Sequence, residues 1–229
     1  MPYDIFTLDW YLRMILIGMC IVFWVFTLFL SRKAKKEGIV GKKNYFLSFS
    51  FFFLSFTLNF TQAELRIANV IMYPKVISPE FKYFIGAPDE WMVFTFLFFF
   101  LGAIPMAFAI ERFLLSHKKV ILTMLGIFAL VLTVCLFLFS LEPNFNNVLC
   151  YIVISVDYIA MIAITLSVLI LYLRFAITSS GNLRAVGLLV FFGFILSVAG
   201  LLLSSNGYIG HIIMLVGFFV VFLGILKMK

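Results

Sequence analysis

Residues 149–172 read LCYIVISVDYIAMIAITLSVLILY, and Asp157 is the only charged side chain in this stretch. The apolar residues are continuous rather than alternating, which is typical of a membrane-spanning helix and not of a strand in a membrane β-barrel. A helix crosses the hydrocarbon core of a bilayer with about 20 apolar residues. The stretch therefore predicts a transmembrane helix that carries one acid well inside it.

Six further apolar runs of similar length occur in the chain. With the first, they predict helices over residues 11–30, 45–66, 91–113, 120–140, 149–172, 185–204 and 208–226. The composition agrees, because 65% of the 229 residues are hydrophobic and 12% are charged, whereas soluble domains are about half apolar and a quarter charged. We expect one all-α integral membrane domain over residues 1–229, a bundle of seven transmembrane helices.

The distribution of positive charge predicts the orientation of this bundle. All but four of the 17 Lys and Arg residues fall in or at the edge of the first, third and fifth connections and at the C-terminus; the exceptions are Arg13, Arg66, Lys75 and Lys82. Cytoplasmic loops of membrane proteins carry an excess of Lys and Arg. We therefore expect the N-terminus outside and the C-terminus in the cytoplasm, with the plasma membrane as the location. The net charge of +7 then reflects topology, and no nucleic-acid partner is expected.

Polar side chains within the predicted spans gather in the outer half of the bundle. With a rise of about 1.5 Å per residue, they lie about one to three helical turns below the outer surface. The candidates for ligand binding are Asn59, Gln62, Asp157, Ser197 and His211. Polar residues in membrane helices also bond simply to neighbouring helices, which is the alternative for Asn59, Gln62, Ser197 and His211.

Asp157 differs from the other candidates, because a charged side chain at this depth costs about 2.5–3.5 kcal/mol on insertion scales. It therefore needs a partner or a raised pKa, and Arg13 and His211 are the nearest partners by depth. The alternative to a functional role is a structural ion pair or a protonated hydrogen bond. Near the outer interface, we expect Arg13, Glu64 and Arg66 to form ion pairs.

The opposite end of the run 91–113 carries Glu111-Arg112, followed by Lys118 and Lys119. The acid–Arg pair resembles the pair found at this place in G-protein-coupled receptors, and the resemblance implies contact with a cytoplasmic partner protein. The alternative is an interfacial ion pair beside topological lysines. Pro105 predicts a kink that either serves as a hinge or only shapes the bundle.

Two other segments carry predictions about packing. The connection Tyr73–Glu90 either covers the outer mouth or lies on the lipid surface. On the run 185–204, Gly187, Gly193 and Gly200 predict a close helix contact, within the monomer or between copies of a homo-oligomer.

Several functions are disfavoured by missing residues. No lysine lies within a predicted span, which excludes a retinal Schiff base. His117 and His211 fall on opposite sides of the membrane, so clustered ligands for zinc or haem are missing. A single buried acid does not make an aspartyl dyad. We expect no cofactor and no metal, and an enzyme is disfavoured without being excluded.

The general plan resembles prokaryotic seven-helix sensory domains and eukaryotic seven-helix receptors. We expect a receptor-like sensor, or a protein that binds a small amphipathic molecule or lipid, with an outward-facing polar pocket and a partner chain that receives the signal. The alternatives are a transporter or channel, with Asp157 as a proton or cation relay, and a structural subunit of a membrane complex.

Overall fold

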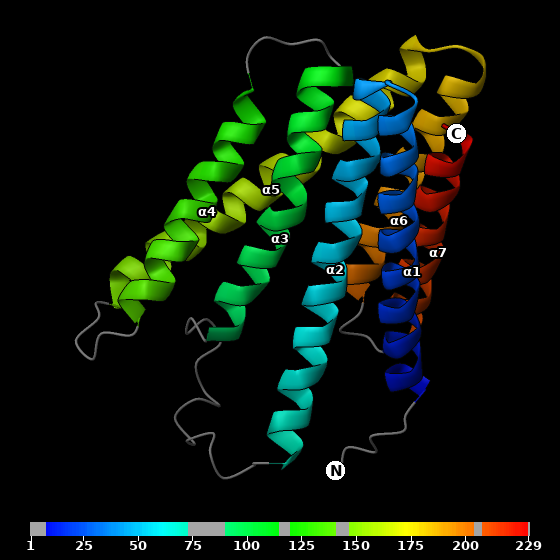
Figure 1. The fold of residues 1–229 in the computed structure, drawn as a ribbon. Helices are drawn as coiled ribbons and strands as arrows, with labels where there is room; N and C mark the ends of the chain where they lie inside the picture. Colours follow the sequence, from blue (N-terminus) through cyan, green and yellow to red (C-terminus); the bar gives the residue numbers. More distant parts are fainter. Residues whose placement is uncertain (1–7, 73–89, 115–119, 141–146, 204–207, 229) are drawn as a thin grey trace.

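A computed structural model describes residues 8–72, 90–114, 120–140, 147–203 and 208–228, and these are almost entirely helical (Figure 1). The helices are α1 (Leu8–Lys36), α2 (Val40–Met72), α3 (Glu90–Ala109), a short π-helix η2 (Ile110–Leu114), α4 (Ile121–Ser140), α5 (Asn147–Thr178), α6 (Gly181–Leu203) and α7 (Tyr208–Lys227). Within the described residues, six helices are long and apolar enough to cross a membrane, and α4 adds a shorter apolar stretch, Ile121–Cys135. This is the architecture of a helical membrane protein, as the sequence predicts.

In the described part of the chain, seven α-helices together with η2 correspond to the seven predicted runs, but the predicted boundaries are too narrow at the first basic connection. The segment 31–44 was expected to be a loop, yet α1 continues to Lys36 and α2 begins at Val40. Lys and Arg are good helix formers, so the basic residues extend the helices. Gly38, with a φ of 75°, ends α1: its N–H donates to Lys35 O, and the N–H of Ile39 donates to Ala34 O. This pair of bonds is a Schellman motif.

Helices that follow one another in the sequence pack against one another, and α7 returns to pack on α1. The chain therefore forms a closed ring in sequence order, and α3 makes an additional contact with α5 across it. We call the end where α1 begins the N-terminal end, and the end where α1 passes into α2 the basic end (Figure 1).

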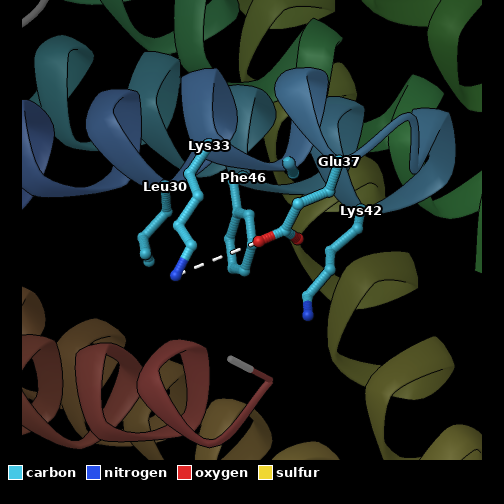
Figure 2. Close-up of a pocket in the computed structure, with 6 residues that line it drawn as sticks. Leu30, Lys33, Glu37, Lys42 and Phe46 are labelled. Carbon is cyan, nitrogen blue, oxygen red and sulfur yellow. Dashed lines mark ion pairs between the residues drawn. The ribbon is translucent and has the colours of Figure 1, made fainter.

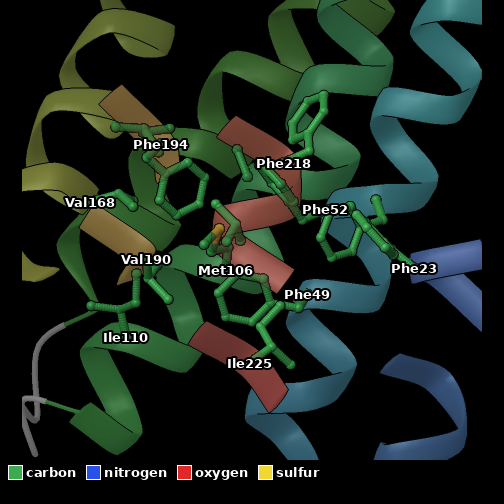
Figure 3. Close-up of a cluster of buried hydrophobic side chains, with 14 of the residues drawn as sticks. Phe23, Phe49, Phe52, Met106, Ile110, Val168, Val190, Phe194, Phe218 and Ile225 are labelled. Carbon is green, nitrogen blue, oxygen red and sulfur yellow. The ribbon is translucent and has the colours of Figure 1, made fainter. Parts of the chain in front are cut away.

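Phenylalanine side chains fill the space between α1, α2, α6 and α7 (Figure 3). Phe52 of α2 meets Phe194 of α6 edge-on at 5.1 Å and Phe218 of α7 at 6.2 Å between ring centroids. Phe23 of α1 stacks on Phe222 of α7 at 3.9 Å. Lipid tails are as apolar as these rings, so burial itself adds little, and the stabilisation comes from packing and aromatic geometry.

Glycines allow α6 and α7 to approach closely. A methyl group added to Gly200 would lie 2.5 Å from the backbone N of Met214, and one added to Gly217 would lie 2.5 Å from the backbone N of Ser197. Gly193 faces Val221 in the same way, while Gly187 lies against Ala176 of α5. The predicted glycine contact is therefore confirmed within the monomer.

Candidate functional site

Asp157 lies on the face of α5 that meets α4, and its side chain is completely buried. Its Oδ2 atom lies 2.8 Å from Thr133 Oγ1, which also lies 2.9 Å from the backbone oxygen of Ala129. A threonine hydroxyl has one hydrogen to donate, so it cannot serve both oxygens at once. The Oδ1 atom of Asp157 is buried and has no hydrogen-bond partner within the described part of the chain. The pair therefore has more hydrogen-bond acceptors than donors.

The expected partners of Asp157 are engaged elsewhere. At the N-terminal end, Arg13 Nη2 lies 3.5 Å from Asp9 Oδ2, and Arg13 Nε lies 3.0 Å from Glu64 Oε1. His211 Nδ1 lies 2.8 Å from Asp9 Oδ1. These four side chains join α1, α2 and α7 in one partly buried group, which we call the ion cluster. Within the described residues, Asp157 has no ion pair with Arg13 or His211, and Thr133 is its partner instead.

The remaining candidates are distributed over several helices. On α2, Gln62 is buried and Asn59 is half-buried, and the Oδ1 atom of Asn59 has no hydrogen-bond partner among the described residues. Ser197 of α6 donates to Gly193 O of its own helix at 2.8 Å and lies against Gly217. The side chain of Arg66 lies outside the described residues. The geometry therefore gives two separate polar groups, one around Asp157 and one around Arg13, in place of a single layer.

At the basic end, Glu111 closes the start of α4. Its Oε1 atom accepts from the backbone N of Leu122 at 2.6 Å, and its Oε2 atom accepts from the backbone N of Thr123 at 3.1 Å and from Thr123 Oγ1 at 2.7 Å. These bonds satisfy N–H groups that have no partner within a helix. Glu111 is buried and Arg112 is exposed, so of this pair only Arg112 is accessible to a partner. Lys118 and Lys119 lie outside the described residues.

Pro105 lies inside α3, shortly before the π-helix η2 begins at Ile110. Proline cannot donate the backbone hydrogen bond that a helix interior requires. Single π-helical turns inside helices often mark functional sites. The end of α3 thus combines a proline, a π-helix and the acid that holds α4.

Two features of the basic end escape sequence reasoning. The hydroxyl groups of Tyr45 and Tyr172 lie 3.1 Å apart in the core and join α2 to α5. Tyr45 begins one predicted run and Tyr172 ends another, and nothing in the sequence indicates that they meet. A small notch also lies between α1 and α2, where Lys33 Nζ and Glu37 Oε1 are 3.9 Å apart. Its lining residues extend to one side of the two helices (Figure 2): Leu30, Lys33, Ala34, Glu37, Lys42 and Phe46.

No group of three or more His, Cys, Asp or Glu side chains in the described part of the chain is arranged to hold a metal ion. No protein-family model, curated protein or solved structure matches this chain. The functional argument therefore rests on the side chains themselves.

Proposed function

We propose that this chain is a receptor-like membrane sensor, or a membrane protein that binds a small amphipathic molecule, and that its ligand is held at Asp157. The observation that supports this is the incomplete hydrogen bonding of the Asp157–Thr133 pair. A buried acceptor without a donor is costly. A ligand with an amine, hydroxyl or amide donor would complete the set, and apolar helices would cover the rest of that ligand.

The proposed signal passes along α3 to the basic end. Tyr158, next to Asp157, meets Phe96 of α3 edge-on with 5.0 Å between ring centroids. From there α3 leads through Pro105 to Glu111, which holds the start of α4. A ligand that shifts α5 would move α3 through the Tyr158–Phe96 contact, and this would change how Glu111 holds the start of α4. A partner chain would detect the change at the exposed Arg112.

The orientation is part of the proposal. We infer that the N-terminal end faces outward and the basic end faces the cytoplasm, because every lysine and arginine in the described residues except Arg13 and Arg66 belongs to the basic end. An outward site for the ligand and a cytoplasmic contact for the partner follow from this orientation.

The experiment is native mass spectrometry of the purified full-length chain, comparing wild type with Asp157→Asn. The matched control is Thr165→Val, which changes another polar residue of α5 away from the pair. We expect a discrete bound mass in the wild type and in the control, and its loss in Asp157→Asn. A wild type without bound mass, or an Asp157→Asn variant that keeps it, would contradict the proposal.

A second function, a transporter or channel, is favoured by one specific observation: the same pair would also accept a proton, because Asp157 Oδ1 has no donor among the described residues. A relay would move protons or cations through this carboxylate. Flux across proteoliposome membranes that stops in Asp157→Asn, without any bound mass, would favour this function over the sensor.

A further inference from the structure

The outward face of α1 changes from apolar to basic along one line. Val22, Val25 and Phe29 are each more than half exposed on this helix, and Arg32 and Lys36 follow at the basic end. With 100° per residue, these five positions share an arc of about 80°. The opposite face of α1 is buried, so this line is the side of the helix that points away from the bundle.

No described helix covers this line. The neighbours of α1 in the ring are α2 and α7, and they pack on the buried face that includes Leu16, Phe23 and Leu30. In a membrane the exposed apolar residues are covered by lipid chains. The basic side chains beyond them reach the level of the lipid headgroups.

The two cations at the end of the line form no ion pair with the described residues. Among the described residues, neither Arg32 nor Lys36 has a carboxylate within ion-pair distance, whereas the nearby Lys33 lies 3.9 Å from Glu37. An arginine binds a phosphate with two parallel hydrogen bonds, and a lysine adds a point charge. Apolar contacts below and two unpaired cations above match the two parts of an anionic phospholipid.

We propose that the α1 face formed by Val22, Val25, Phe29, Arg32 and Lys36 is a binding site for one anionic phospholipid. Its phosphate is held between Arg32 and Lys36, and an acyl chain lies along the three apolar side chains. The site lies on another side of α1 from the ion cluster and does not depend on a ligand at Asp157.

The test measures binding of phosphatidylglycerol and of phosphatidylcholine to the full-length chain in detergent by native mass spectrometry. The double variant Arg32→Gln/Lys36→Gln removes the two proposed phosphate contacts. The matched control Lys35→Gln/Lys227→Gln removes the same charge from exposed positions at the same end but off this line. A Lys or Arg that contacts the bound headgroup should change the affinity roughly fivefold, as a cation at an anionic membrane surface does.

We expect the wild type to prefer phosphatidylglycerol. Removing Arg32 and Lys36 should weaken its binding roughly 10- to 30-fold, while the control changes it less than about threefold. The charge-retaining variant Arg32→Lys/Lys36→Arg should keep most of the binding, which guards against a folding defect. Equal weakening in both Gln variants would mean general attraction of charge and would overturn the proposal, as would a wild type without lipid preference.

A competition arm identifies the part of the ligand that is bound. Glycerol phosphate is added in excess to the phosphatidylglycerol complex. If it does not displace the lipid, the acyl chain contributes as proposed. If it displaces the lipid at concentrations similar to those of the lipid itself, the site binds phosphate alone, and the proposed acyl-chain contact is wrong.

Discussion

At the scale of the residue, the contact between Asp157 and Thr133 has more acceptors than hydrogens. The sequence predicts that Asp157 is the unusual acid, because it is the only charge within its run. It does not predict Thr133 as the partner, because the choice depends on how α4 and α5 meet. Depth alone suggested Arg13 and His211 as partners of Asp157. Both belong to the ion cluster instead, where Arg13 pairs with Glu64 and His211 pairs with Asp9.

Replacing Thr133 with Val removes the hydroxyl from the buried carboxylate. We expect this variant to lose about 1–3 kcal/mol of stability, since a buried polar group is left without its partner. The control is Thr57→Val, because Thr57 is also buried but bonds only to Phe53 O of its own helix; it should lose less than about 1 kcal/mol. Thermal unfolding in detergent measures both, and equal losses would show that the Asp157 contact contributes nothing special.

Glu111 gives a second prediction at this scale. Glu111→Gln keeps the size of the side chain but weakens charge-assisted bonds to the start of α4, so we expect a loss of about 1–2 kcal/mol. Arg112→Gln is the control, because its exposed side chain should change stability by less than about 0.5 kcal/mol. Thermal unfolding measures the stability of the two variants. A larger loss of stability in Arg112→Gln than in Glu111→Gln would argue against the capping role of Glu111.

At the scale of the element, the helices were predictable and their ends were not. Continuous apolar runs identify the seven helices, because the bilayer requires about 20 apolar residues for each. The ends at Lys36 and Thr178 lie beyond the predicted runs, because hydropathy marks where the membrane stops and not where the helix stops. Gly38, with a φ of 75°, was the local signal for the end of α1, and Gly181, with a φ of 58°, begins α6.

The close contact of α6 with α7 gives a prediction for glycine substitutions. Gly200→Ala and Gly217→Ala each place a methyl group against backbone atoms, so the helices must separate, and we expect a loss of about 1–3 kcal/mol. Gly18→Ala is the control, because an added methyl group there meets nothing within 4 Å; it should be neutral or gain up to about 1 kcal/mol from helix propensity. Midpoints of thermal unfolding compare the three, and a tolerant Gly217 would contradict the close packing.

At the scale of the whole molecule, the seven helices form a ring that follows the order of the sequence. Short connections favour such a ring, because consecutive helices must be neighbours. The closure of α7 on α1 through Phe23 and Phe222 and the separation of the polar groups into two sites were not predictable. Both features depend on which helix faces meet. The sequence does not show these faces, because nearly every position in the helices is apolar and the amphipathic pattern is weak.

The orientation of the ring is tested by labelling single cysteines in intact cells. In a background with Cys20, Cys135 and Cys150 replaced, Tyr208→Cys should react with a membrane-impermeant maleimide from outside. Lys35→Cys should react only after permeabilisation, because basic segments stay in the cytoplasm. If Lys35→Cys reacts from outside and Tyr208→Cys reacts only after permeabilisation, the proposed ligand site and partner surface lie on the opposite sides of the membrane from those proposed.

The most direct test of the proposed function is a cryo-electron microscopy map of the full-length chain purified in lipid nanodiscs. We predict non-protein density within hydrogen-bond distance of the Asp157 carboxylate, between α4 and α5. The same map of Asp157→Asn should lack it. A map in which α4 and α5 close around Asp157 and Thr133 with protein atoms alone would contradict a ligand-binding role for this site.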